Sequence, residues 1–385
     1  MPALRTRMTA RDTTEAHRVS SPLELLFDLT FVVAVAQIAA ELAHGIVEGH
    51  ALEVLGPYLM VFFAIWWAWM NFTWFASAYD TDDVPYRLLT LVQIGGVLVL
   101  ASGVHSAASG GGYLAITLGY LIMRLGLVAQ WVRAGIQHRE GRTTALRYAA
   151  GVTVVQAGWL LRLLLPDELQ VVSFIVLAAL DVSVPMWAER TGSTAWHPHH
   201  IAERYGLFTI ILLGEGLFGA TAALQAVVGH GLSAELVVIA VAGLVLVFAV
   251  WWLYFSEPAG EGLAENRDRS FLWGYGHYAM FAALAALGAG LEAAVLSTEE
   301  HHEATAQTLG YGVAIPVAIV LLLLWVLHVP IVERPVLSPV AIIVACVVIL
   351  VVPLSAAALG LAAVLSIVTA TVVALLAMTL YRASR

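Results

Sequence analysis

Lysine is absent from this chain, in which all 18 basic residues are Arg. Without lysine the chain cannot form the Schiff base that retinal or pyridoxal chemistry requires. It also lacks the lysine with which an orthodox P-loop reaches the phosphates of a nucleotide. These absences exclude a light-driven retinal protein and a self-contained P-loop ATPase. Since Cys346 is the only cysteine, intrachain disulfides and thiolate metal sites are excluded as well.

Charged residues are also scarce. They make up 12% of the chain, whereas apolar residues make up 61%, against about 25% and 45–50% in soluble domains. A water-soluble fold of this length could not bury so much apolar surface, so the composition predicts the lipid bilayer as the main partner. The sequence has no basic face that would indicate binding of nucleic acid, and no cofactor is predicted.

Apolar stretches of about 20 residues, the length that crosses a bilayer core of about 30 Å, recur along the whole chain. The sequence predicts about twelve transmembrane helices and therefore an all-α polytopic integral membrane protein. The expected spans are 23–43, 54–78, 86–106, 113–136, 145–164, 169–188, 203–224, 234–256, 270–294, 307–329, 338–357 and 360–381.

The Arg residues test this count. With the N-terminus inside, sixteen of the eighteen lie in the tails and the loops assigned to the cytoplasm, and only Arg124 and Arg162 lie elsewhere. This bias follows the positive-inside rule. We therefore expect a multi-pass protein of the cell membrane with both termini cytoplasmic, residues 1–22 forming the N-terminal tail.

Three matches recur in the same order in both halves of the chain. FAIWW at 63–67 returns as FAVWW at 248–252, and TLGY at 117–120 returns at 308–311. Glu24 with Thr30 returns as Glu203 with Thr209. The sequence thus predicts two parallel six-helix repeats, 23–188 and 203–381, with a polar path where they meet, as in other parallel-repeat transporters.

Three segments resemble a known family: SPLELLFDLTFV at 21–32, the Trp pair at 66–67, and ERYGLF at 203–208 with LGE at 213–215. Together they are similar to the bacterial low-temperature-requirement protein A (LtrA) family. The resemblance extends over most of the chain. It implies a membrane protein connected with growth in the cold, but it implies no particular reaction.

The first helix is also similar to the Phe-Ser-Asp helix that opens each repeat of the lysosomal two-repeat potassium channels. Glu24, Phe27, Asp28 and Phe31 reproduce the spacing. This chain departs from that pattern in two ways. No Ser precedes Asp28, and in the second predicted repeat Leu207 stands at the position that corresponds to Asp28.

Ionisable side chains inside a span are costly unless they are paired or hydrated, so each is a functional candidate. Glu24 and Asp28 lie four residues apart, hence on one helix face; they are either a capped helix start or a cation or proton site. Glu215 falls near mid-bilayer among glycines, where a carboxylate needs a partner, a proton or water. Arg124 is the partner we expect, in a functional or a structural ion pair.

Further polar residues complete the predicted ion or solute path. Glu203 and Arg204 belong to the family-like segment that opens the second repeat, whereas Gln37, Gln93 and His277 lie at depth. Gln93 and His277 fall at nearly equivalent repeat positions, where hydrogen bonding between helices is the alternative. His197, His199 and His200 with Glu203 are residue types that bind metals, but Pro198 and the predicted loop argue against a site, and no metal is predicted.

We therefore expect a transporter or channel-like protein for a small ion, such as a cation or proton, or a small solute. One alternative is a membrane-embedded enzyme acting on lipid or an isoprenoid, but no Ser/His/Asp arrangement, Asp-rich metal motif or dinucleotide fingerprint supports it. The other is a non-transporting protein that the membrane needs in the cold. The sequence sets neither the substrate nor the oligomeric state.

Overall fold

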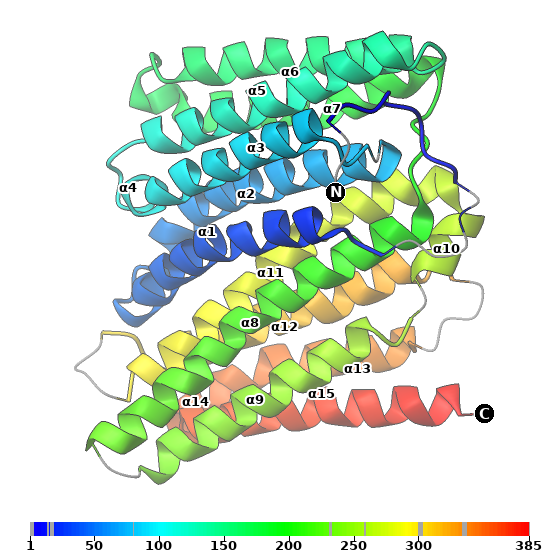
Figure 1. Cartoon of the computed structure of the whole chain (residues 1–385). Helices are drawn as coiled ribbons and strands as arrows, with labels where there is room; N and C mark the ends of the chain where they lie inside the picture. Colours follow the sequence, from blue (N-terminus) through cyan, green and yellow to red (C-terminus); the bar gives the residue numbers. More distant parts are fainter. Residues whose placement is uncertain are drawn as a thin grey trace. The chain divides into compact units, whose positions relative to one another are not determined.

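The computed structural model of the chain is built of helices (Figure 1), as predicted, and its described residues contain no strand. It describes all residues except 1–3, 14, 16–18, 80, 231–232, 258, 299–302, 333–336 and 385, and only the backbone of 218–230. The long helices are α1 (Pro22–Val47), α2 (Ala51–Ala78), α3 (Val84–Ser102), α5 (Leu114–Gln137), α6 (Arg142–Arg162), α7 (Gln170–Ala188), α8 (Pro198–His230), α9 (Ala234–Tyr254), α11 (Ser270–Leu296), α12 (Ala306–His328), α13 (Pro339–Val351) and α15 (Leu361–Ala383).

Short helical segments connect several of these. They are α4 (Val104–Ala108), α10 (Ala259–Glu265), α14 (Ala356–Leu359) and the 3₁₀ turns η1 (Asp167–Leu169), η2 (Glu189–Thr191), η3 (Arg267–Arg269) and η4 (Val352–Ser355).

Each of the twelve predicted stretches coincides with a helical segment. Ten helices in the described part of the chain are long and apolar enough to cross a membrane. α6 and α8 are not among these ten. The multi-pass class is therefore established, whereas a count of twelve spans stays a prediction.

The contacts between residues divide the chain into two compact units. The first unit comprises Met1–Ala34 and Met60–Arg204, and the second comprises Val35–Leu59 and Tyr205–Arg385. This grouping does not test the predicted repeats, which remain a prediction.

In the first unit, consecutive helices pack side by side: α3 on α5, α5 on α6, and α6 on α7 (Figure 1). Glycine permits the α3–α5 contact. A Cβ added to Gly96 would lie 2.6 Å from Met123 Cγ and 2.7 Å from the carbonyl oxygen of Gly119. The backbones therefore approach more closely than any larger residue would allow, as is common between membrane helices.

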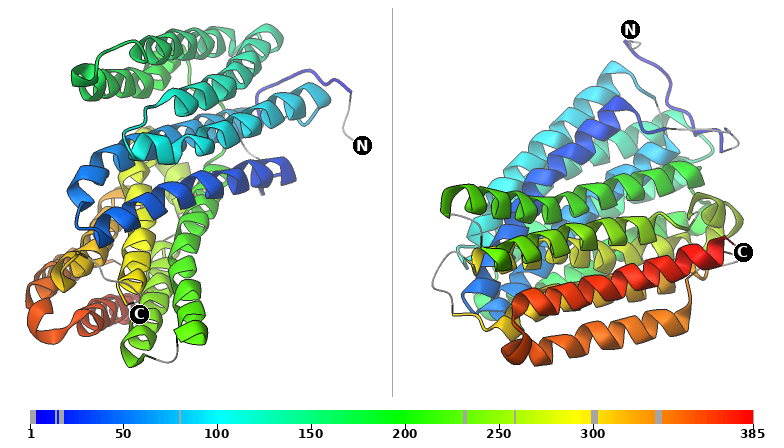
Figure 2. Two further views of the ribbon diagram at one scale, coloured as in Figure 1. Left: turned by 90° about the vertical axis from the view of Figure 1, so that its left-hand side faces the viewer. Right: turned by 90° about the horizontal axis from the view of Figure 1, so that it is seen from below.

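In the second unit, α11 packs on α12, α12 on α13, and α13 on α15. Figure 2 shows α15 lying between α13 and α9, and it contacts both. Gly290 on α11 lies against the backbone of Gly312 on α12, so glycine again permits a close contact between two consecutive long helices.

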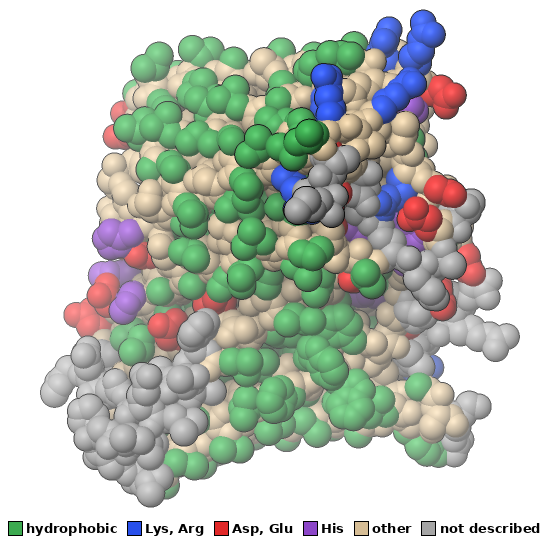
Figure 3. Space-filling view, in the orientation of Figure 1, with side chains coloured by type: hydrophobic (Ala, Val, Ile, Leu, Met, Phe, Trp, Pro, Cys, Tyr) green, Lys and Arg blue, Asp and Glu red, His purple; other side chains and the backbone are tan. Residues whose placement is uncertain are grey.

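The helices of the first unit carry apolar side chains on their outer faces. On α7, Val171, Val172, Ile175 and Val176 are each more than half exposed. Figure 3 shows hydrophobic side chains over the middle of α3, α5 and α6, and Arg side chains gathered at one end. An apolar belt bounded by charged ends is what a bilayer requires.

The N-terminal tail binds at one end of the first unit. Asp83, just before α3, accepts hydrogen bonds from the backbone N–H of Thr6 at 2.8 Å and from Arg133 Nη1 at 2.8 Å. The backbone N–H of Met8 donates to Gln137 Oε1 at 2.7 Å. The tail, the α2–α3 loop and the end of α5, all predicted to be cytoplasmic, therefore lie at the same end of this unit.

Candidate functional site

The first turn of α1 places Glu24 by a local rule. The backbone N–H of Ser21 donates to Glu24 Oε2 at 2.7 Å, and the backbone N–H of Glu24 donates to Ser21 Oγ at 3.3 Å. This reciprocal pair is a capping box, and Pro22 takes the first helical position, where its missing N–H costs nothing. Asp28 follows one turn later on the same face. Both carboxylates are almost fully buried.

Two residues of α8 face these carboxylates. His200 Nε2 lies 3.0 Å from Glu24 Oε1, and Arg204 Nη1 lies 3.5 Å from the same oxygen. Arg204 Nη2 donates to Asp28 Oδ1 at 2.5 Å. His200 and Arg204 are completely buried and, like their partners, are four residues apart. Two helices thus present matched ionisable pairs to each other.

A third pair comes from α2. Trp69 Nε1 donates to Asp28 Oδ1 at 2.7 Å, and Thr73 Oγ1 accepts from Arg204 Nη2 at 3.2 Å. Both side chains are fully buried. Trp69 follows the Trp pair at 66–67 on the same helix, and its bond to Asp28 gives it a role that packing alone would not require.

We call Glu24, Asp28, Trp69, Thr73, His200 and Arg204 the first-unit cluster, because all six residues belong to that unit. The cluster leaves polar atoms unsatisfied. Asp28 Oδ2 and Arg204 Nε and Nη1 are buried and have no hydrogen-bond partner. Arg11 of the tail also interacts electrostatically with His200. An unpartnered carboxylate oxygen in such a place costs free energy that a proton, a water or a small cation would relieve.

Arg124 pairs with Asp181 on α7, whereas the sequence predicted Glu215 as its partner. Arg124 Nη2 donates to Asp181 Oδ1 at 2.6 Å and to the Tyr120 hydroxyl at 2.8 Å. Trp159 Nε1 donates to Asp181 Oδ2 at 2.7 Å. The cause is the consecutive packing of α5, α6 and α7, which brings an acidic residue of the same unit to the guanidinium. Both carboxylate oxygens are satisfied, so this is a closed pair.

Other predicted path residues make hydrogen bonds between helices. Gln93 Nε2 donates to Gln130 Oε1 on α5 at 3.0 Å. In the second unit, His277 Nε2 lies 3.3 Å from the Tyr254 hydroxyl on α9, and its Nδ1 lies 2.7 Å from the Trp273 carbonyl oxygen. Gln93 and His277 therefore each join their helix to a neighbour within their own unit.

The remaining predicted residues are Glu203 in the first unit and Gln37 and Glu215 in the second. Glu203 accepts a hydrogen bond from the backbone N–H of Ser20 at 3.1 Å. Gln37 is half-buried on α1 in the second unit. Glu215 is buried in the second unit, and its Oε1 has no hydrogen-bond partner.

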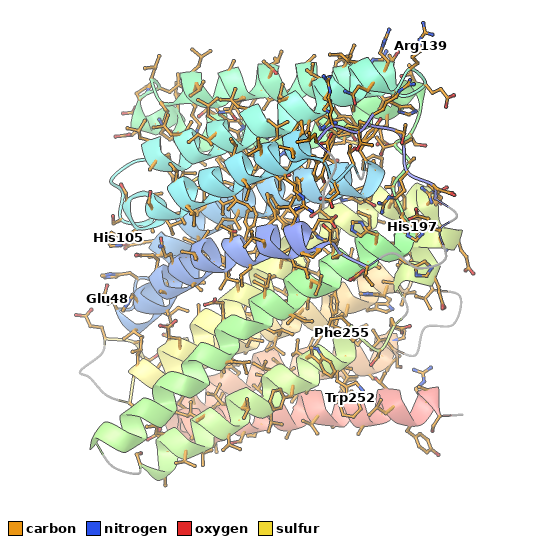
Figure 4. All side chains as sticks on the ribbon, viewed as in Figure 1. Glu48, His105, Arg139, His197, Trp252 and Phe255 are labelled. Carbon is orange, nitrogen blue, oxygen red and sulfur yellow. The ribbon has the colours of Figure 1, made fainter. Side chains whose placement is uncertain are left out.

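The histidine group at the start of α8 separates into different roles. His197 (Figure 4) lies with Nε2 2.9 Å from the Glu15 carbonyl oxygen, whereas His200 faces Glu24. Among the described residues no set of three or more His, Cys, Asp or Glu side chains is arranged to hold a metal ion. Sequence reasoning missed Trp69 and Thr73 as site residues, although their spacing of four on α2 was a usable signal.

Comparison with known proteins identifies relatives of this chain. The family model for the bacterial low temperature requirement A protein (LtrA) matches residues 19–378. The chain is also 27% identical over 295 residues to "Uncharacterized protein RA0937" of Rhizobium meliloti (strain 1021). This alignment covers 71% of this chain and 68% of the relative.

Proposed function

We propose that this chain, which belongs to the bacterial low temperature requirement A (LtrA) family, moves a small ion, a proton or another small cation, across the membrane as a transporter or channel-like protein. Family membership and the apolar helices identify the chain as a multi-pass membrane protein. The proposal of transport comes from the ionisable residues that these helices bury.

The observation that carries the proposal is Asp28 Oδ2, a buried carboxylate oxygen without a hydrogen-bond partner beside unsatisfied donors of Arg204. The closed Arg124–Asp181 pair is the comparison within the same unit, because a purely structural ion pair is expected to satisfy its atoms in this way. Asp28 keeps one oxygen available for an exchangeable proton or cation. An ion path needs such groups, since a completely satisfied pair offers no site for an ion.

The predicted repeat architecture is part of this proposal. In both units the third long helix packs on the fourth, the fourth on the fifth and the fifth on the sixth, counting from α1 and from α8, as two parallel six-helix repeats would require. The matched Trp residues differ in environment: Trp66 is 2% exposed, whereas Trp251 is 44% exposed. The two repeats would thus have the same order of helix packing, but the matched Trp residues would be buried in the first repeat and partly exposed in the second. A path between them, like the cytoplasmic position of both termini, stays a prediction.

A flux assay on purified protein in liposomes tests the proposal. With an imposed pH gradient, or with gradients of K⁺ or Na⁺, we expect the wild type to move at least one of these ions. Asp28→Asn should lose most of this flux while unfolding near the wild-type temperature. Arg204, unlike Arg124, keeps a second carboxylate, Glu24, at 3.5 Å, and the amide keeps an oxygen that accepts from Trp69. The matched control is Asp82→Asn, since Asp82 forms an exposed pair with Arg87. Wild-type liposomes that are no leakier than protein-free ones would refute the proposal.

A further inference from the structure

The second unit contains a buried carboxylate that nothing described so far explains. Glu215 lies near the middle of α8, only 7% exposed, and its Oε1 has no hydrogen-bond partner. It lies 15 residues before the end of α8, or about 22 Å, because each residue adds about 1.5 Å to a helix. Apolar side chains pack beside it: a Cβ added to the next residue, Gly216, would lie 2.7 Å from Val247 Cγ2 and 3.7 Å from Leu291 Cδ1.

Glu215 lies against α11. A Cβ added to Gly288 would lie 2.8 Å from Glu215 Cβ and 3.1 Å from the backbone nitrogen of Gly216, so the two helices touch at this point. Glu292 follows Gly288 by four residues and thus lies on the same face of α11. Because helical side chains lean toward the N-terminus of their helix, Glu292 extends back over Gly288 and toward Glu215. The two carboxylates interact electrostatically.

A histidine connects this pair with the surface. His44, on the part of α1 that belongs to the second unit, interacts electrostatically with Glu292. His44 is exposed, Glu292 is half-buried and Glu215 is buried. The three side chains thus form a series of decreasing exposure, and imidazole is a group that exchanges protons readily near neutral pH.

We propose that Glu215 and Glu292 form a proton-binding carboxylate pair, which exchanges its proton with solvent through His44. Two carboxylates that interact in apolar surroundings cannot both be charged without a large free-energy cost, and holding one proton removes it. The described residues offer no third ligand for a metal ion. The proposal deepens the proposed function by naming the proton as the ion, although proton binding itself is measured without transport.

Infrared spectroscopy of the purified protein tests the proposal. A protonated carboxyl group has a C=O stretch that shifts in D₂O and is absent from an ionised carboxylate. We expect this band in the wild type at neutral pH, its loss in Glu215→Gln and its loss or displacement in Glu292→Gln. Glu53→Gln is the matched control, because Glu53 is an exposed carboxylate of the same unit, and it should keep the band.

The band and its pH titration in the wild type do not depend on whether a variant folds. Absence of the band at neutral pH would overturn the proposal, as would a band that persists in a folded Glu215→Gln protein. A band removed by Na⁺ at constant pH would identify a cation site instead and would also overturn it. The band is measured at equilibrium and does not depend on transport. A protein with the band but no flux would refute only the proposed function, whereas a protein with flux but no band would refute only this inference.

Discussion

At the scale of single residues, the chain uses buried charges in two ways. Arg124 and Asp181 satisfy each other and are held by Tyr120 and Trp159. Asp28 and Glu215 each keep a buried oxygen without a partner. The first arrangement holds α5 and α7 together, whereas the second leaves a group that can take up an ion. Burial is common to both arrangements, so hydrogen-bond satisfaction is what separates them in this structure.

The closed pair makes a prediction about stability. Arg124→Gln or Asp181→Asn alone should destabilise the protein by about 3–5 kcal/mol, because each leaves the other charge buried and unpaired. The double variant should recover much of this loss. Unfolding of all four proteins in one detergent measures the coupling. Single losses that simply add in the double variant would contradict the pairing.

Asp83 makes a prediction about pH. Burial would raise the pKa of Asp83, but hydrogen bonds from Arg133 and from the backbone N–H groups of Thr6 and Tyr86 outweigh it and hold this pKa below its ordinary value. The stabilisation from these bonds is thus present above the ordinary pKa of about 3.9 and is lost as the pH falls through the lower, folded value. Asp83→Asn should therefore be less stable than wild type at neutral pH and approach it in acid. Thermal unfolding across pH measures this difference, and a difference that does not change with pH would contradict it.

At the scale of elements, helix contacts depend on where glycine falls along a face. Gly95 and Gly96 are neighbours on α3 with opposite surroundings. A Cβ at Gly95 meets nothing within 4 Å, whereas one at Gly96 would lie 2.8 Å from the backbone nitrogen of Met123. The same residue type is thus dispensable at one position and required at the next.

This difference predicts opposite effects of one substitution. Gly96→Ala should destabilise the protein by about 1–3 kcal/mol, because a backbone atom cannot move aside as a side chain can. Gly95→Ala should be neutral or slightly stabilising, since alanine favours a helix by about 1 kcal/mol over glycine. Thermal unfolding of the two variants compares them directly. Equal losses would contradict the α3–α5 contact.

At the scale of the whole molecule, successive loops of a multi-pass protein alternate between the cytoplasmic side and the outside of the membrane. Arg139 and His105, labelled in Figure 4, lie at opposite ends of the first unit and are both exposed. In a Cys346→Ser background, Arg139→Cys should be shielded in intact cells from a thiol reagent that cannot cross the membrane, whereas His105→Cys should react. After the cells are opened both should react, which controls for accessibility. Labelling of Arg139→Cys from outside would invert the proposed topology.

The sequence by itself determined the all-α membrane class, the positions of the helices and the capping box that places Glu24 one turn before Asp28. These features depend on composition, helical period and residues within one turn of each other, so short segments specify them. Only the tertiary structure decided the partners. Arg204 lies 176 residues from Asp28 along the chain, and Asp181 rather than Glu215 meets Arg124. Such pairs form because particular helix faces pack together, and that packing depends on contacts along whole helices, which no local pattern of residues contains.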